Sequence, residues 1–178
     1  PGGGLSPSAP APWSRPVRRR FDAGAEHLGF YLRNGGMLNL QTKRGCPFQC
    51  HFCLYNKIEG AQQRYRDPVE VAKEVETLNK RYGVGHIWFT DAQFCSTRRS
   101  LAHAEAVLDE MIARQVKVRW TGYLRLNHLT PESARKMIAS GLESIDLSFT
   151  GSQDMIDSLT LGYELEQQME AFRLFKDA

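Results

Sequence analysis

Three cysteines lie close together in the segment RGCPFQCHFC, which spans residues 44–53. They are Cys46, Cys50 and Cys53, and the chain has four cysteines in all. Thiols at this density could form disulfides, bind a zinc ion or hold an iron–sulfur cluster. The rest of the sequence has to distinguish between these three kinds of chemistry.

Disulfides suit this chain least. A secreted scaffold that depends on disulfides has more cysteines in a shorter chain than four in 178 residues. Cysteines this near to one another also cannot link the two ends of a long loop. We therefore predict a reducing, cytoplasmic location and a metal site.

Zinc and iron–sulfur place different demands on the remaining residues. Structural zinc takes four ligands, typically in two separated pairs, whereas this chain has three clustered cysteines, with His51 among them, and the distant Cys95. An iron–sulfur cluster with three close cysteine ligands keeps one iron open for a substrate or cofactor, which suits an enzyme better than an electron carrier. The spacing alone leaves zinc open as an alternative.

The bulk composition is that of an ordinary globular domain. Apolar residues make up 42% of the chain, charged residues 24%, and the net charge is +3. The basic run RPVRRR at 15–20 has no aromatic-rich basic surface beside it, so we interpret it as a solvated linker face and do not expect nucleic-acid binding. No stretch approaches the ~18 apolar residues that a membrane span needs.

The first residues, PGGGLSPSAPAP, are rich in glycine, proline, serine and alanine and have no apolar core, so they are not a signal peptide. We predict a flexible linker over residues 1–20, which would follow another domain, and one folded domain over 21–178.

The elements that must position the cysteines alternate along the rest of the chain. The spacing of apolar residues predicts strands at 35–42, 86–91, 116–126 and 144–150, and helices at 67–83, 97–114 and 130–141. Asp67 and Thr130 are predicted N-caps, each followed by proline at the first helical position. The inward faces are predicted to be Val71, Val75, Leu78 and Tyr82 in the first helix; Leu101, Ala104, Leu108 and Met111 in the second; Ala134, Met137 and Ile138 in the third; and Leu165, Met169, Phe172 and Phe175 in a last helix.

Alternating strands and helices specify an α/β fold with a parallel sheet, either doubly wound or a (β/α) barrel. No GxGxxG follows the first strand, which disfavours a dinucleotide fold. Four units are too few to close a barrel, and the last predicted helix would be followed by another strand. We predict a partial (β/α) TIM-type barrel of about four units that belongs to a larger catalytic unit.

In such folds the functional groups gather at the carboxyl ends of the strands. The cysteine loop leaves the first predicted strand at this end. Asp91 follows the second strand, Arg125 lies near the end of the third, and Ser148 and Thr150 lie at the end of the fourth. We expect these residues to face one site.

At this point the residues resemble a known family. The pattern Cys46-x3-Cys50-x2-Cys53, with Phe52 before the last cysteine, is similar to the signature of radical S-adenosylmethionine (SAM) enzymes. The resemblance implies a [4Fe–4S] cluster on the three cysteines, SAM chelating the fourth iron, and cleavage of SAM to a 5′-deoxyadenosyl radical. It also implies an external electron donor of the flavodoxin or ferredoxin type.

The same resemblance assigns roles to the other site residues. Phe52 would pack near the adenine, and Asp91 with its neighbours Thr90 and Ala92 would bind the SAM amino group. Arg125 would bind the SAM carboxylate. Ser148 and Thr150 would meet the ribose or methionine end, although Phe149 stands where relatives often have a glutamate. The alternative for each residue is an ordinary packing, turn or surface role.

Residues 36–175 look like the branch whose members often carry a cobalamin-binding domain, but the DxHxxG motif of that domain is absent here. The branch implies methyl transfer, through methylcobalamin, to an unactivated carbon of a small molecule or natural-product precursor. The alternatives are a cobalamin-independent radical rearrangement or cyclisation and, outside the enzymes, an electron-transfer or structural metal protein.

Cys95 is the candidate catalytic residue: a substrate-handling thiol, a group near cobalt, a fourth cluster ligand or a buried apolar residue. We expect His51, His86, His103 and His128 to be packing or surface residues.

Overall fold

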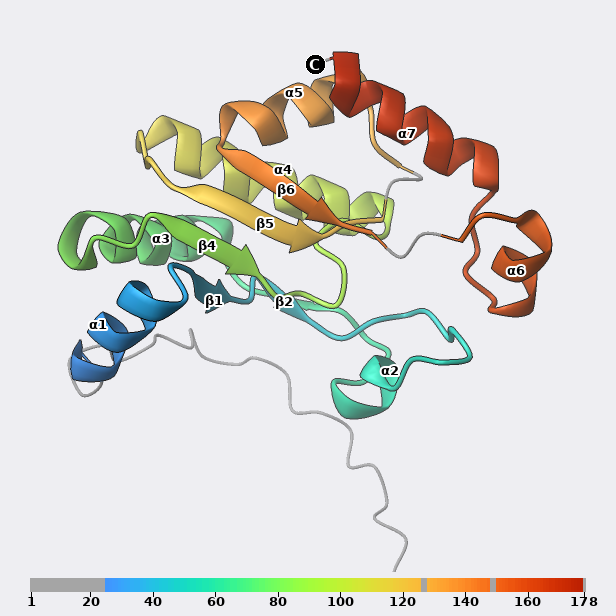
Figure 1. The fold of residues 1–178 in the computed structure, drawn as a ribbon, viewed down its shortest axis with the longest axis horizontal. Coiled ribbons are helices and arrows are strands. Elements are labelled where there is room, and N and C mark those ends of the chain that lie inside the picture. Colours follow the sequence, from blue (N-terminus) through green and yellow to red (C-terminus); the bar gives the residue numbers. More distant parts are fainter. Residues whose placement is uncertain (1–24, 126–127, 148–149, 178) are drawn as a thin grey trace, which may run out of the picture.

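The computed structural model describes residues 25–125, 128–147 and 150–177. The helices are α1 (Ala25–Asn34), α2 (Tyr55–Ile58), α3 (Pro68–Tyr82), α4 (Arg98–Ala113), α5 (Pro131–Ala139), α6 (Gln153–Ser158) and α7 (Leu165–Asp177). The strands are β1 (Leu38–Leu40), β2 (Lys43–Arg44), β3 (Arg64–Tyr65), β4 (His86–Phe89), β5 (Arg119–Tyr123) and β6 (Leu142–Asp146) (Figure 1). The predicted linker at 1–20 and the predicted site residue Ser148 lie outside the described residues.

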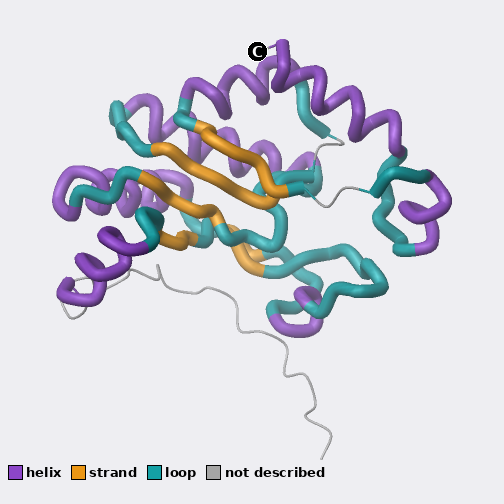
Figure 2. Tube along the Cα trace, viewed as in Figure 1, coloured by secondary structure: helices purple, strands orange, loops and turns teal. Residues whose placement is uncertain are grey.

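Four strands form one parallel sheet in the order β1-β4-β5-β6, which is also their order along the chain. A doubly wound sheet reverses its strand order at a switch point, whereas this sheet does not. The helices α3, α4, α5 and α7 form a single layer over the sheet, in which successive helices contact one another (Figures 1 and 2). The predicted partial (β/α) barrel is confirmed.

The core lies between this sheet and its helices. Ile87, Phe89 and Trp120, from β4 and β5, are fully buried and belong to one cluster with buried residues of α3 and α4. The ring of Phe89 lies 5.5 Å from that of Trp120, and Trp120 donates its indole N–H to the Ser140 hydroxyl at 3.0 Å. Large aromatic side chains with satisfied polar atoms therefore fix the sheet against the helix layer.

The predicted helix ends are confirmed where a capping residue marks them. The Asp67 carboxylate accepts the N–H of Glu70 at 3.0 Å, and α3 ends at Gly83 in the left-handed region, at φ +68°. The Thr130 hydroxyl accepts the N–H of Ser133 at 3.1 Å at the start of α5. Local sequence thus sets both ends of α3 and the start of α5.

The predicted inward faces of α3 and α4 are confirmed apart from Tyr82, which is half-buried, but those of α5 and α7 are partly wrong. Ile138 is 40% exposed, and Met169 and Phe172 are 38% and 43% exposed. Helix α7 buries Gln168 and Ala171 in their place. The reason is its position at the end of the helix layer, where it packs mainly on α5.

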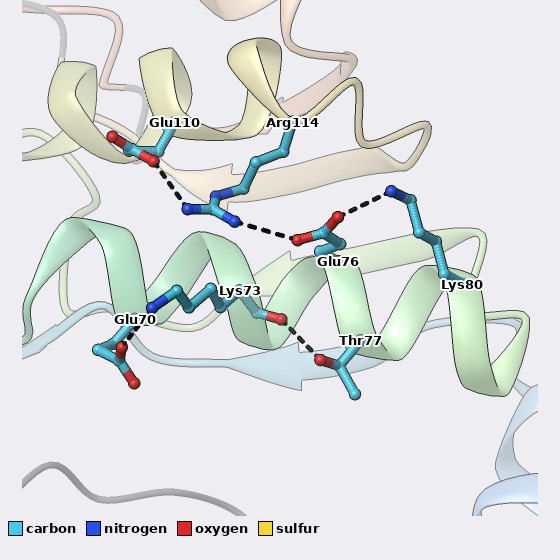
Figure 3. A network of polar contacts seen from close by, with 7 residues as sticks. All are labelled: Glu70, Lys73, Glu76, Thr77, Lys80, Glu110 and Arg114. Carbon is cyan, nitrogen blue, oxygen red and sulfur yellow. Dashed lines mark hydrogen bonds and ion pairs between the residues drawn. The ribbon is translucent and has the colours of Figure 1, made fainter.

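Helices α3 and α4 are also joined by ion pairs on their outer surface (Figure 3). Arg114 of α4 reaches Glu76 of α3 at 3.2 Å and Glu110 of its own helix at 3.3 Å. Lys80 pairs with the other oxygen of Glu76 at 2.7 Å. Such half-exposed pairs contribute little individually, and the buried side chains remain the main contact between the helices.

Candidate functional site

The cysteine loop, residues 45–63, is closed at its base by the short antiparallel pair β2–β3. Gly45 donates its N–H to Glu59 Oε2 at 3.1 Å, and Cys46 donates to the carbonyl of Gly60 at 3.0 Å. Gly45 has φ +91°, in the region that favours glycine. These contacts make the loop a closed unit that begins directly after β2.

The three cysteines of this loop line one open cavity, of about 190 Å³, at the carboxyl ends of the parallel strands. Its lining comes from three parts of the chain: Cys46, Phe48, Cys50, Phe52, Cys53 and Tyr55 from the loop; Ala92, Gln93, Tyr123, Leu124, Arg125 and Leu147 from the strand ends; and Leu161, Tyr163 and Gln168 from the segment beyond α6. The structure therefore brings the predicted cysteines together with residues that follow β4, β5 and β6.

All three cysteines have free thiols, with Cys46 buried and Cys50 and Cys53 half-buried. Burial raises the pKa of Cys46, the Phe48 N–H lowers it, and the nearby Cys50 and Cys53 thiols raise it again. The thiols are thus close enough to influence one another. Deprotonating all three requires a compensating positive charge, which a metal centre supplies.

Among the described residues, no three His, Cys, Asp or Glu side chains approach closely enough to hold a single metal ion. A [4Fe–4S] cluster makes a different demand, because each cysteine binds its own iron at a corner of the cluster.

Arg125 forms one wall of the cavity. Its guanidinium carbon lies 3.9 Å from the centre of the Phe48 ring and 5.2 Å from that of Tyr163, so the side chain is held between two aromatic rings. Burial lowers the pKa of Arg125, while Cys50, Tyr163 and Cys46 raise it. A fixed cation therefore stands beside the cysteine loop, as predicted for the end of the third strand.

Asp91 lies behind the cavity and is fully buried. Its Oδ1 accepts the N–H groups of Thr42 at 2.9 Å and Lys43 at 2.8 Å, and its Oδ2 accepts the Thr42 hydroxyl at 2.9 Å. The next two residues, Ala92 and Gln93, line the cavity instead. The predicted role of Asp91 towards an amino group stays a prediction, and its oxygens are already engaged.

Lys43 is a site residue that the sequence analysis missed. It is 1% exposed, and its ammonium group donates to the carbonyls of Gln93 and Phe94, the latter at 3.4 Å. Gln93 has φ +121°, which is rare for a residue with a side chain. Only its position directly before the cysteine loop could have drawn attention to Lys43, because burial of a lysine leaves no signal in one sequence.

A segment of residues 158–163, here called the strap, contacts the cysteine loop. The imidazole Nδ1 of His51 lies 2.8 Å from the carbonyl of Ser158, and the Thr160 hydroxyl donates to the carbonyl of Gln49 at 3.1 Å. The prediction that His51 is a packing or surface residue is thus refined: the side chain is exposed, yet it ties the loop to the strap.

The remaining predicted site residues differ in how they relate to the cavity. Phe52 lines the cavity and is 61% exposed. Thr150 is half-buried and is not among the residues that line the cavity. Phe149, like Ser148, lies outside the described residues.

Cys95 is buried, with 3% of its surface exposed. It is not among the residues that line the cavity. Its Sγ is 3.6 Å from the carbonyl oxygen of Arg125, and burial raises its pKa to about 12. The thiol is therefore protonated at neutral pH, and none of the predicted catalytic roles of Cys95 is tested by this geometry.

The remaining histidines lie away from the cavity. His86 bonds to Thr121 at 2.9 Å and lies 3.2 Å from Glu143, at the amino ends of the strands. His103 bonds to the carbonyl of Arg66 at 2.8 Å, and His128 is half-buried before α5.

Parallel strands in chain order, with three free cysteines on the loop after the first strand, define the class: a (β/α)-barrel protein with a cysteine-lined cavity at the carboxyl ends of its strands. The family profile described as the radical SAM superfamily matches residues 40–178. The chain belongs to this superfamily.

The chain is also similar to individual proteins. The tryptophan 2-C-methyltransferase of Streptomyces laurentii is 33% identical over 85 residues, which are 48% of this chain and 14% of that protein. The radical SAM methyltransferase TsrM from Kitasatospora setae, solved with tryptophan and a SAM analogue, superimposes with a TM-score of 0.75 at 24% identity over 83% of this chain and 30% of its own. The cobalamin-dependent SAM radical enzyme OxsB superimposes with a TM-score of 0.61 at 19% identity, over 78% of this chain and 22% of the OxsB chain.

The chain therefore spans less than a third of the length of each of these relatives. In the described residues, no helix has the length and apolar character needed to cross a membrane.

Proposed function

We propose that this chain is the cofactor-binding part of an enzyme that uses a [4Fe–4S] cluster and SAM. One observation carries the proposal: three free thiols from a single closed loop line one cavity at the carboxyl ends of the parallel strands. The donor set fits the cluster, because thiolates are its ligands and three of them leave one iron open. When bound, the cluster and SAM supply radical or methyl-transfer chemistry that no side chain can perform.

The other predicted site residues would hold SAM. Arg125, fixed between Phe48 and Tyr163, would bind the carboxylate, since a planar guanidinium matches it in shape. Phe52 would cover the adenine from the cavity edge. Ser148 and Thr150 keep their proposed roles towards the ribose or methionine end.

For the SAM amino group, the turn after β4 offers a better partner than Asp91. Gln93 lines the cavity, and its buried Oε1 has no hydrogen-bond partner among the described residues. An amide oxygen in this situation can accept a hydrogen bond from an ammonium group. We therefore assign the amino group to Gln93 and the adjacent Ala92.

The proposed reaction is methyl transfer to an unactivated carbon of a small molecule, with cobalamin as methyl carrier and an external flavodoxin- or ferredoxin-type donor for electrons. Support comes from the relatives, which include a tryptophan methyltransferase and a cobalamin-dependent enzyme. The second candidate is a cobalamin-independent radical rearrangement or cyclisation. Base-off cobalamin spectra of the full-length protein, present or absent, separate the two.

Anaerobic reconstitution with iron and sulfide tests the core of the proposal. We expect about four iron atoms per chain and a change in the paramagnetic resonance spectrum of the reduced cluster when SAM is added. Cys53→Ser should lose the cluster, whereas Cys95→Ala should keep it. An electron-transfer or structural metal protein predicts no response to SAM, and stoichiometric zinc in place of iron would refute the assignment.

A further inference from the structure

Two segments, residues 42–43 and 91–94, hold each other through hydrogen bonds that run in both directions. From the first segment, the N–H groups of Thr42 and Lys43 and the Thr42 hydroxyl donate to Asp91, all at 2.8–2.9 Å. From its side chain, Lys43 donates to the carbonyls of Gln93 and Phe94. Thr42, Lys43 and Asp91 are each no more than 1% exposed.

Burying two charged side chains in this way carries a desolvation cost that apolar side chains would not. A buried carboxylate and a buried ammonium each lose their hydration, and apolar side chains of similar volume are often at least as stabilising. The Asp91 carboxylate and the Lys43 ammonium group do not pair with each other among the described contacts; each bonds to the main chain of the opposite segment. Their contacts therefore specify the relative position of two backbones.

Both backbones continue into the cavity. Residues 42–43 lead through Gly45 to Cys46, the first cysteine of the cavity. Residues 91–94 include Gln93, whose φ of +121° is maintained while its N–H bonds back to the Asp91 carbonyl at 2.7 Å and its own carbonyl accepts from Lys43. A strained residue persists only where its surroundings over-determine it, and here Lys43 and Asp91 are those surroundings.

We propose that Asp91 and Lys43 are positioning residues: they fix the turn containing Gln93 against the start of the cysteine loop and do not themselves touch SAM. This inference rests on the proposed function, because it concerns the geometry of the proposed SAM site. It predicts that the charge of Asp91 is dispensable for SAM binding, whereas its hydrogen-bond acceptors are not.

Asp91→Asn separates the two roles. The amide oxygen can still accept both main-chain N–H groups, and the amide nitrogen can donate to the Thr42 hydroxyl. We expect the dissociation constant for SAM, measured on the reconstituted chain by titrating the SAM-induced change in the resonance spectrum, to stay within about threefold of wild type. Asp91→Ala should weaken binding by more than about tenfold. If Asp91→Asn weakens SAM binding as much as Asp91→Ala does, Asp91 contacts SAM and the inference is wrong.

Asp91→Asn leaves the Lys43 ammonium group without the nearby negative charge of Asp91. The double variant Asp91→Asn/Lys43→Met removes both charges and provides one independent test. Smaller changes at Thr42 provide another. Thr42→Val removes one bond to Asp91 and should weaken SAM binding and alter the spectrum, and Thr42→Ser should restore both. Lys43→Met should weaken SAM binding at unchanged iron content, and the double variant should do so by no more than Lys43→Met. Equal SAM affinity in Lys43→Met and wild type would contradict the positioning role.

Lys136→Met is the matched control, since this lysine pairs with Asp109 at 2.9 Å between α4 and α5, outside the cavity. It should leave SAM binding unchanged. Failure of the proposed function would be distinguishable, because the wild-type chain itself would then contain no four-iron cluster or show no response to SAM.

Discussion

Gly45 occupies a crowded backbone position in the cysteine loop. A Cβ atom at this residue would lie 2.2 Å from the carbonyl oxygen of Gln62 and 3.1 Å from that of Gly60. Both atoms belong to the returning side of the loop, so neither can move without opening the loop. Glycine is thus required here for conformation and for space at the same time.

Gly45→Ala is expected to disrupt the cluster site. The left-handed φ alone costs about 1–3 kcal/mol for a residue other than glycine, and the clash with Gln62 adds to this cost. We expect a lower free energy of unfolding in urea and little bound iron after reconstitution. Gly83→Ala is the matched control, because Gly83 has φ +68° but open space around it, and it should lose stability while keeping its iron.

His103 makes the stability of the chain depend on pH. Its Nε2 donates to the carbonyl of Arg66, which can only accept, so the neutral ring has a bare, buried Nδ1 without a partner among the described residues. Burial lowers the pKa of His103, and the bond to Arg66 only partly opposes this. The folded chain therefore binds this proton less readily than the unfolded chain does.

Since the folded pKa lies below the unfolded value of about 6.5, this histidine's share of stability is complete above that pH and is lost as the pH falls through the folded pKa. We expect the free energy of unfolding, measured in urea, to fall between neutral and mildly acidic pH by more in wild type than in His103→Gln. The glutamine amide can still donate to the Arg66 carbonyl but does not titrate. Equal pH dependence in both proteins would show that His103 does not titrate in this range.

At the scale of single residues, the sequence could predict those that act through their chemistry. The sequence alone identifies three cysteines on one loop and Arg125 near the end of the third strand, and the structure places all four residues in the lining of one cavity. Lys43 and Gln93 could not be predicted in the same way. Their roles depend on burial and on backbone conformation, which arise only when segments about 50 residues apart meet.

Secondary-structure elements also divide into those that the sequence predicts and those that depend on tertiary contacts. The four strand–helix units carry a periodic apolar pattern, the helices of the first three begin at capping residues, and all four were predictable. Helix α2 and the strands β2 and β3 have four residues or fewer, and their pairing depends on closure of the cysteine loop by Gly45 and Glu59. Tertiary contacts, which a single sequence does not reveal, create these short elements.

The strap is an element whose local stability can be tested. The His51 side chain links it to the cysteine loop through one exposed hydrogen bond to the Ser158 carbonyl, in addition to the main-chain bond from the His51 N–H to the Leu159 carbonyl. A bond of this kind contributes about 0.5–1.5 kcal/mol, so His51→Ala should speed hydrogen exchange at residues 158–161 by about two- to tenfold. Global unfolding should change little. His128→Ala, at a half-buried histidine outside the strap, should leave this exchange unchanged, and equal effects of the two variants would contradict the link.

At the scale of the whole molecule, the cysteine loop is tied to distant parts of the fold. Asp91 joins its base to the end of β4, and the strap joins its centre to α6. The position of the three thiols in the folded chain therefore depends on contacts with the parallel sheet and with α6. A ligand that binds them in the folded chain, and less strongly in the unfolded chain, stabilises the entire domain.

We accordingly expect reconstitution with iron and sulfide to raise the urea midpoint of the wild-type chain, and removal of iron by a chelator to reverse the shift. Each of Cys46→Ser, Cys50→Ser and Cys53→Ser should abolish the increase, because a cluster held by two thiolates is bound far more weakly. Cys95→Ala should retain it even if the starting stability is lower, since this thiol is buried, protonated and outside the cavity lining. Loss of the increase in Cys95→Ala would instead make Cys95 a ligand and leave no iron open for SAM.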